Sequence, residues 1–300
     1  MPRLSVIVPA YNAAATIIPA IRSSLRALPR DAEVVVLDDG STDATAEEIG
    51  RIDDSRVRVL SRPNRGVAAA LNELLSVTDS EFVARMDADD LVLPGRFRRQ
   101  RQAVGAGADA VFTTVVTWGA GVPSLPRPTG IEPEDFPLHL LLTNPVAHST
   151  LFARRSAMVD AGGYRSVPTE DYDLWLRMAV RGTRLRRLPL PGLAYRIHPG
   201  QVTASMSWRR SSWESAELSQ SYSALAETLL GAPARRITSL SIADGATDAD
   251  KRAELDVFSE RFRSAAASHA PRARRALHRK LGERRSWLHS RLSDTEVSHV

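Results

Sequence analysis

The chain has 300 residues, of which 43% are hydrophobic and 25% are charged, a balance typical of a folded protein with a sizeable core. It contains no cysteine, which excludes disulfide bonds and thiolate metal sites. No apolar run reaches the roughly 18 residues that cross a bilayer, and the N-terminus lacks the features of a secretory signal. We therefore predict a cytoplasmic protein of one large or two modest domains.

The positive charge is concentrated near the end of the chain. The formal net charge is +5, and the segment from Arg261 to Arg291 holds ten lysines and arginines but one acidic residue, Glu283. A basic tail of this kind could bind acidic lipid headgroups or nucleic acid, or could have no specific partner.

Short apolar runs alternate with segments of helical pattern over the first 90 residues. Strands are predicted at residues 4–8, 33–37, 57–60 and 82–86. Helices are predicted between them at about residues 14–28, 42–49 and 67–75, the second with Ser41 or Thr42 as its N-cap. This alternation predicts βαβ units and a mostly parallel sheet.

Beyond residue 90 the alternation becomes irregular. Strands are predicted at residues 109–117, 146–154, 185–188 and 193–196, and helices at 94–104, 156–161 and 171–181. Residues 119–137, rich in proline and glycine, predict a loop. After about residue 198 the pattern is helical, with helices at 211–230, 249–263 and 272–292 and a polar loop at 239–248. We therefore predict an α/β domain over residues 1–200 and a helical region over 201–300.

Two acidic clusters follow two of the predicted strands. Asp38 and Asp39 end one strand, and Asp87, Asp89 and Asp90 follow another. In an open α/β sheet, ligands bind beyond the carboxyl ends of the strands, so both clusters can face one pocket. Carboxylates there suit Mg²⁺ or Mn²⁺ and a hydroxyl-rich ligand. Two alternatives remain open: an Asp-x-Asp segment can be a solvated turn, and Asp38 can cap the next helix.

Other polar residues could take part in chemistry or could be structural. Tyr11 follows the first strand and could stack on a planar base or pack on the sheet edge. Glu170 and Asp171 begin a helix, whose dipole keeps a carboxylate ionised, so one could be a general base or both could be placed for the dipole alone. His148 and His198 could each be a metal ligand, a phosphate contact or a structural residue. Phosphate binding and solvation are both open for three arginines, Arg65, Arg85 and Arg96.

Eight segments, in this order and spacing, resemble the family 2 glycosyltransferases of GT-A fold. They are residues 5–12, 36–43, 64–72, 86–90, 144–150, 161–164, 170–175 and 195–198. The resemblance covers about residues 3–200 and implies a Rossmann-like, mostly parallel sheet flanked by helices. It does not extend to residues 201–300, a helical appendage that could serve oligomerisation or association with a membrane or acceptor.

The resemblance implies a site for a nucleoside-diphosphate sugar. Pro9, Tyr11 and Asp39 would hold the base and ribose, with Asp38 close to them. Arg65 would be the one cation that its segment offers to the phosphates, because residues 68–70 are all alanine.

The resemblance also assigns the metal and the acceptor side. Asp87 and Ala88 would line the sugar nucleotide, and Asp89 and His198 would hold Mn²⁺ or Mg²⁺ at the diphosphate. Asp171 would be the general base of an inverting transfer, with Glu170 supporting it or touching the acceptor, a glycan, lipid-linked sugar or protein hydroxyl. His148 would line the acceptor or sugar side.

Departures from the family pattern narrow the expected reaction. The chain has no Gln-x-x-Arg-Trp motif of processive synthases, so we predict a single sugar addition in cell-surface glycan or glycolipid assembly. One alternative is a sugar-phosphate nucleotidyltransferase, which needs a basic loop where residues 9–16 have no basic residue. Another is a non-catalytic nucleotide-sugar-binding protein, which is expected to lack Asp87, Asp89 or Asp171. We expect no nucleic-acid partner. Two roles remain open for the C-terminal region: residues 272–291 could bind an anionic membrane, or residues 211–263 could pair with a second subunit in a homo-oligomer.

Overall fold

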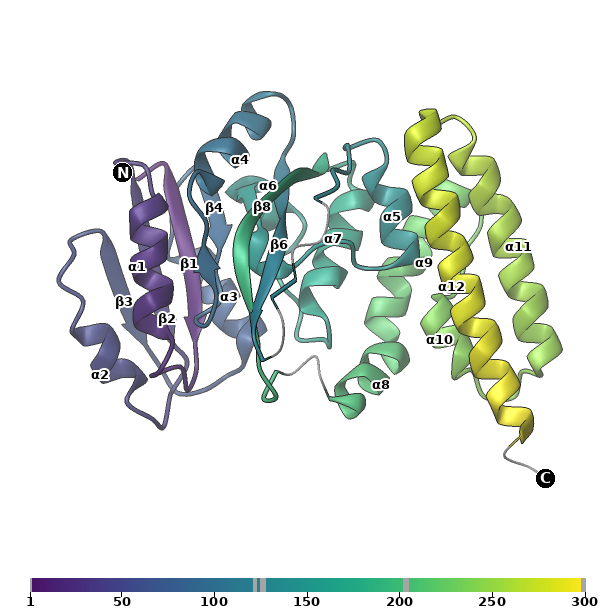
Figure 1. The fold of residues 1–300 in the computed structure, drawn as a ribbon, viewed down its shortest axis with the longest axis horizontal. Coiled ribbons are helices and arrows are strands. Elements are labelled where there is room, and N and C mark those ends of the chain that lie inside the picture. Colours follow the sequence, from purple (N-terminus) through teal and green to yellow (C-terminus); the bar gives the residue numbers. More distant parts are fainter. Residues whose placement is uncertain (1, 121–122, 125–127, 202–204, 298–300) are drawn as a thin grey trace.

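The computed structural model describes residues 2–120, 123–124, 128–201 and 205–297, with side chains placed up to residue 292. Figure 1 shows a central sheet with helices around it and the last two helices, α11 and α12, at the end of the molecule farthest from β3. Residues 121–122 and 125–127 of the predicted loop 119–137 lie outside the described residues.

The first half of the sheet is parallel, as the sequence predicts. Strand β1 pairs on one side with β2 and on the other with β4, and β2 pairs with β3. These strands are β1 (Leu4–Ala10), β2 (Ala32–Asp38), β3 (Val57–Ser61) and β4 (Phe82–Arg85). The helices that connect them are α1 (Ile17–Ala27), α2 (Thr45–Gly50) and α3 (Val67–Ser76).

The second half of the sheet mixes both directions. The strand order is β3-β2-β1-β4-β7-β6-β8-β5 over the described residues, with β7 antiparallel to β4 and β6, and β5 antiparallel to β8. These strands are β5 (Leu91–Val92), β6 (Ala110–Gly119), β7 (Phe152–Arg154) and β8 (Leu185–Ile197). The helices are α4 (Arg96–Gly105), α5 (Phe136–Leu142), the 3₁₀ turn η1 (His148–Thr150), α6 (Arg155–Asp160) and α7 (Glu170–Val180).

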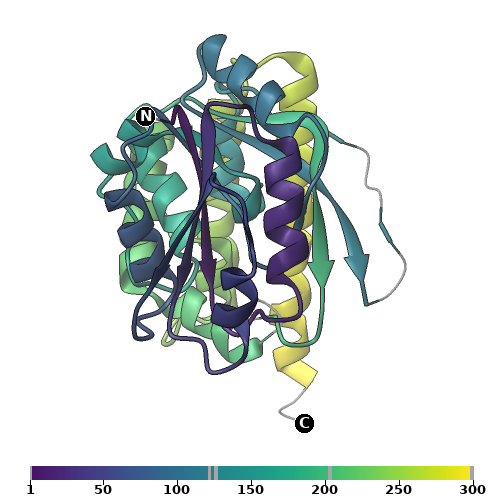
Figure 2. The ribbon, with the colours of Figure 1, turned by 90° about the vertical axis from the view of Figure 1, so that its left-hand side faces the viewer.

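Strands β1, β2 and β4 are buried on both faces, and two hydrophobic cores lie on opposite sides of the sheet. Successive side chains of a strand point to opposite faces, and β1 follows this rule. Val6 and Val8 join the core under α1 and α4, whereas Ile7 joins the core under α3 and α7. Figure 2 shows α1 against one side of these strands.

The C-terminal helices pack against the α3–α7 side rather than standing apart. They are α8 (Met206–Glu214), α9 (Ala216–Leu230), α10 (Ile237–Ser241), α11 (Asp248–Ala266) and α12 (Pro271–Val297). Leu281 and Leu288 of α12 belong to the same core cluster as Trp175 of α7. Tyr222 of α9 donates a hydrogen bond to the carbonyl of Leu141 at 2.8 Å. The division at residue 200 remains a prediction.

The predicted N-cap of α2 is wrong. The helix begins at Thr45 after Ala44, because Ser41 and Thr42 are bound to the end of β1 instead. The Ser41 hydroxyl accepts a hydrogen bond from the Asn12 backbone N–H at 3.0 Å, and the Asn12 side chain accepts one from the Thr42 N–H at 2.8 Å.

Four other boundaries also differ from the prediction. The strand expected at 146–154 is the turn η1 followed by the short β7, and the two strands expected within 185–196 are one strand. A register shift opposite Thr114 lets β8 run through Pro189 and Pro191. The helix expected at 211–230 breaks at Ser215, whose hydroxyl caps α9. The loop expected at 239–248 begins inside α10.

Candidate active site

A carboxylate cluster lies directly after β4. Oxygen atoms of Asp87, Asp89 and Asp90 all lie within 4.8 Å of one another. The Nε2 atom of His198, at the end of β8, is 3.1 Å from Oδ2 of Asp89. The turn after β4 and the end of β8 therefore bring together hard oxygen donors and one imidazole, a donor set that suits a divalent cation.

Asp90 is the most deeply buried member of this cluster. One of its oxygens accepts the Arg196 backbone N–H at 2.8 Å, while Oδ2 is buried with no hydrogen-bond partner among the described residues. Burial and the nearby Asp87 carboxylate raise the pKa of Asp90 to about 7, and burial also raises the pKa of Asp89. A cation would offset the cost of these crowded carboxylates, so the residues fit a metal site.

Two arginines that we expected at phosphates or at the surface are buried instead. Arg85 is turned toward Asp87, with which it forms an ion pair. Arg96 is 0% exposed and donates hydrogen bonds to the carbonyl oxygens of Arg85 at 3.1 Å and Leu151 at 3.2 Å. The expectation of solvation was therefore wrong for both, because both side chains are buried, whereas a phosphate contact stays a prediction.

The carboxylate of Asp39 holds a neighbouring loop. It is 3% exposed and accepts hydrogen bonds from Nε of Arg62 at 2.7 Å and from the backbone N–H groups of Arg65 at 3.1 Å and Gly66 at 2.9 Å. The Arg65 side chain is exposed. A ligand role for Asp39 and Arg65 stays a prediction, and it would have to coexist with this loop contact.

The remaining residues at the ends of β1 and β2 lie near the same edge. Asp38 accepts hydrogen bonds from the backbone N–H of Ser41 at 3.2 Å and the hydroxyl of Ser61 at 3.2 Å, so it closes turns and does not cap α2. Tyr11 is 52% exposed, so its ring is not packed against the sheet edge. Pro9 pairs with Leu37 across the parallel strands.

A second group of polar side chains gathers at the start of α7. Oδ2 of Asp171 accepts a hydrogen bond from the side-chain amide of Asn144 at 2.8 Å. Nε2 of His148 is 2.8 Å from the Tyr164 hydroxyl, and Nδ1 is 3.6 Å from Oε1 of Glu170. Burial raises the pKa values of Asp171 and Glu170, and the Asn144 hydrogen bond opposes the rise at Asp171. A carboxylate with a raised pKa is a better proton acceptor.

His148 connects this group to the carboxylate cluster. Burial and the Arg85 cation lower the pKa of His148 to about 3, while the carboxylates of Asp171 and Asp87 oppose this shift. The Arg85 cation likewise opposes the rise in the Glu170 pKa. Asp87 and Asp171 therefore both lie near enough to one imidazole to influence its pKa, although 84 residues separate them in the sequence.

Two residues beside this site have a strained backbone conformation. Among the described residues, Asn12 and Thr169 are the non-glycine residues with positive φ, at 50° and 62°. Asn12 follows β1, and Thr169 directly precedes Glu170. Such conformations cost about 1–3 kcal/mol each and tend to occur at functional sites, which agrees with the placement of both residues.

Sequence reasoning missed three residues of the site. Asn144 and Tyr164 entered it only through the resemblance, without a role, and Asp90 was not assigned as a metal ligand. The proximity of Asp90 to Asp87 and Asp89 was a usable signal for a third ligand. No local pattern connects Asn144 to Asp171, because their contact depends on how α5 and α7 pack.

The protein-family model of glycosyl transferase family 2 matches residues 5–161. The chain belongs to this family. Its relatives include a putative glycosyltransferase, EpsE, of Bacillus subtilis, which is 34% identical over 61% of this chain and 69% of its own length. WfaP of Escherichia coli, a UDP-Glc:alpha-D-GlcNAc-diphosphoundecaprenol beta-1,3-glucosyltransferase, is 28% identical over 68% of this chain and 81% of its own length.

Solved structures confirm the GT-A fold predicted from the sequence. Staphylococcus aureus TarS (residues 1–349, in complex with UDP-GlcNAc) superposes with a TM-score of 0.62 at 18% identity, over 99% of this chain and 92% of that one. The Pyrobaculum calidifontis mannosyltransferase PcManGT, in complex with GDP-Man and Mn²⁺, has a TM-score of 0.56 at 20% identity, over 100% and 88%. The enzyme is therefore a glycosyltransferase of this family. Within the described residues, no helix has the length and apolarity to span a membrane.

Proposed function

We propose that the protein is a metal-dependent inverting glycosyltransferase that adds a single sugar from a nucleoside-diphosphate sugar to an acceptor hydroxyl. The observation that carries this proposal is the cluster of carboxylates from Asp87, Asp89 and Asp90 beside His198, which is a candidate site for a metal ion and the diphosphate of a donor. The family membership supports the same reaction class.

The carboxylate cluster supports a divalent ion, Mn²⁺ or Mg²⁺. Asp89, Asp90 and His198 would hold it, since Asp89 already faces His198 and Asp90 has a buried oxygen without a partner among the described residues. Asp87 is paired with Arg85 and would lie beside the ribose and diphosphate. When bound, the ion would neutralise charge that develops on the diphosphate.

Asp171 supports the role of general base. Its hydrogen bond from Asn144 fixes the position of the carboxylate, and burial makes that carboxylate a stronger proton acceptor. The acceptor oxygen would form a bond to the anomeric carbon while the bond from that carbon to the diphosphate oxygen breaks. The hydroxyl proton would pass to Asp171, and attack opposite the leaving group would invert the anomeric centre.

The relatives support a UDP-sugar as donor and a surface glycan as product. The name of WfaP includes UDP-Glc as donor and a diphosphoundecaprenol-linked sugar as acceptor, and TarS was solved with UDP-GlcNAc. A lipid-linked acceptor of this kind would place the enzyme at the inner face of a membrane. The complex of PcManGT with GDP-Man makes guanosine the alternative base to test.

The proposal is tested by donor hydrolysis and nucleotide binding. We expect Asp171→Asn to bind UDP with Mn²⁺ normally but to release nucleoside diphosphate about 10²–10⁴-fold more slowly, the usual contribution of a general base. We expect Asp89→Asn to lose metal-dependent UDP binding. The control is Asp160→Asn, at the exposed end of α6. Wild-type turnover in Asp171→Asn, or metal-dependent UDP binding retained in Asp89→Asn, would show the corresponding assignment to be wrong.

A further inference from the structure

A pocket lies between α1 and α4, beside the start of β1. Its volume is about 650 Å³, within the range of about 300–1,000 Å³ that is usual for small-molecule sites. We call it the α1–α4 pocket. Most of its lining side chains are apolar, and they include Leu4, Ala27, Leu28, Val92, Phe97 and Phe152.

The charged residues of this lining are all arginines. Arg26 comes from α1, and Arg98 and Arg101 come from α4. Nη1 of Arg101 is 3.6 Å from Oδ2 of Asp31. Arg26 and Arg98, in contrast, have no ion pair within the part of the chain that the structure describes. Further exposed arginines without such a partner in the described chain occur in the same segments, namely Arg22, Arg30 and Arg99. Guanidinium groups of this kind are available to bind an anion.

The pocket therefore combines an apolar wall with unpaired cations. An apolar ligand alone would leave the arginines unused, and a small free anion would leave the apolar surface exposed to water. A ligand that has both an alkyl chain and an anionic head satisfies both parts, because a guanidinium binds phosphate oxygens through two parallel N–H groups. We propose that the α1–α4 pocket binds an anionic amphiphile, with its chain against Ala27 and Leu28 and its phosphate on Arg26 and Arg98.

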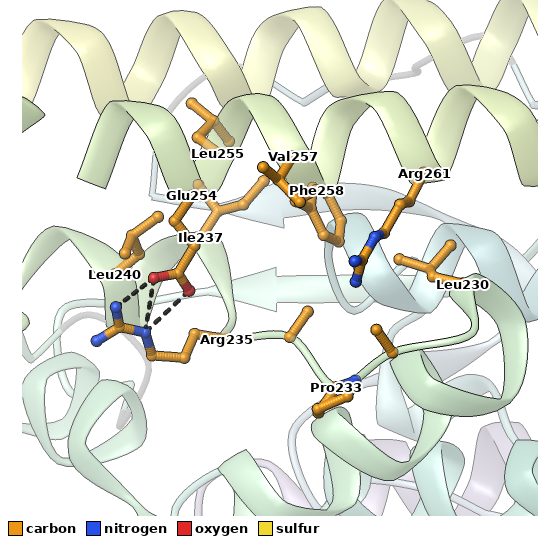
Figure 3. Close-up of a pocket in the computed structure, with 12 residues that line it drawn as sticks. Leu230, Pro233, Arg235, Ile237, Leu240, Glu254, Leu255, Val257, Phe258 and Arg261 are labelled. Atoms are coloured by element: carbon orange, nitrogen blue, oxygen red, sulfur yellow. Dashed lines mark hydrogen bonds and ion pairs between the residues drawn. The ribbon is translucent and has the colours of Figure 1, made fainter. Parts of the chain in front are cut away.

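Two other basic surfaces fit such a ligand less well. The cavity in Figure 3, between α9, α10 and α11, has a volume of about 150 Å³, and its Arg235 is already bound to Glu254 at 2.9 Å. On α12, Arg279 and Lys280 both pair with Glu283. In both places the described acidic neighbours already neutralise part of the charge.

The pocket lies mainly at the opposite end of β1 from the candidate active site, although Val92 of its lining comes two residues after Asp90. Leu4 begins β1, whereas the residues of the candidate active site follow the end of β1 and β4. Seven residues of strand span about 20 Å. Figure 1 shows α4 at the end of the sheet opposite to the arrowheads of β1 and β2. The proposal consequently does not depend on the donor, the acceptor or the base.

Calorimetric titration with monomeric n-dodecyl phosphate, kept below its micelle concentration, tests the proposal directly. Inorganic phosphate and n-dodecyl maltoside separate the head from the chain, and vesicles of phosphatidylglycerol separate a membrane source from a free amphiphile. The first variant, Arg26→Gln/Arg98→Gln, removes the unpaired cations, and the second, Ala27→Phe, fills the pocket. The matched control is Arg272→Gln/Arg275→Gln on the exposed face of α12.

We expect dodecyl phosphate to bind with a 1:1 stoichiometry, and each pocket variant to weaken it about tenfold or more, since charge-assisted hydrogen bonds are lost or the chain is excluded. Binding of the vesicles with the same sensitivity would identify a membrane lipid as the source. Equal binding by the pocket variants and the wild type would overturn the proposal, as would equal affinity for dodecyl maltoside. Vesicle binding that is lost only in the α12 control would assign the charge effect to α12 instead. Unchanged melting temperatures without ligand, together with unchanged donor hydrolysis, show that the variants are folded.

Discussion

The hydrogen bond between Asn144 and Asp171 gives the sharpest test of the proposed site. The substitution Asn144→Ala removes the side-chain amide that donates to Oδ2 of Asp171 at 2.8 Å. Two effects of opposite sign follow. The pKa of Asp171 rises, because this hydrogen bond opposes the effect of burial, and the carboxylate also loses its fixed position.

The expected size follows from the strength of a hydrogen bond to a charged group, about 1.5–3 kcal/mol. Loss of this hydrogen bond therefore raises the pKa of Asp171 further. A more basic carboxylate would speed proton transfer slightly. A proton acceptor must also lie about 2.6–3.2 Å from the hydroxyl, so we expect the lost orientation to dominate and kcat to fall about 10–100-fold.

The assay is the release of nucleoside diphosphate from the donor, measured across the pH range. Asn144→Ala should move the acidic limb of the kcat profile to higher pH, because the carboxylate must be ionised to act as the base and its pKa is raised in the variant. Thr143→Ala is the matched control, since among the described residues the Thr143 hydroxyl makes one long hydrogen bond, 3.5 Å to the carbonyl of Asn144. An Asn144→Ala profile with an unshifted acidic limb and a wild-type plateau would refute the reasoning.

Three further predictions concern stability. Burial lowers the pKa of His139 from 6.5 to about 4, so the unfolded chain takes up this proton first as the pH falls. This group therefore contributes stability above about pH 6.5, and the contribution is lost as the pH falls toward about 4. Urea unfolding at about pH 7 and about pH 4.5 measures the loss of unfolding free energy between these two conditions. His139→Gln should make that loss smaller by about 2–3 kcal/mol. Gly163→Ala should destabilise by about 1–3 kcal/mol, because φ is +63° and the added Cβ would lie 2.6 Å from Oδ1 of Asn72. Gly282→Ala, with open space around it, should instead be neutral or stabilising by up to about 1 kcal/mol, and a similar loss in both variants would contradict the steric argument. Leu281→Ala should lower the free energy of unfolding by about 2–5 kcal/mol and shift a single melting transition of the whole chain to lower temperature. A separate melting transition for the helical region would favour two independent domains.

Much of the fold follows from local pattern. The apolar runs that end in Leu37 and Met86 predicted β2 and β4, and their alternation with helices predicted the parallel half of the sheet. Such runs are readable because a strand buried on both faces needs a short, continuous apolar segment. The antiparallel β7 was misjudged, since it has three residues and its direction depends on pairing with β4 and β6.

The candidate site was only partly accessible to the same reasoning. The sequence by itself determined that acidic turns follow β2 and β4, because a strand that ends at a sheet edge exposes the next residues to a ligand. The tertiary structure decided that Asn144 donates a hydrogen bond to Asp171 and that Arg85 forms an ion pair with Asp87. It also decided that one buried oxygen of Asp90 has no hydrogen-bond partner among the described residues. It also placed Arg26 and Arg98, which have no ion pair among the described residues, beside an apolar pocket. These contacts join residues far apart in the chain or depend on burial, and periodicity, which reports only the near neighbours of each residue, carries no information about them.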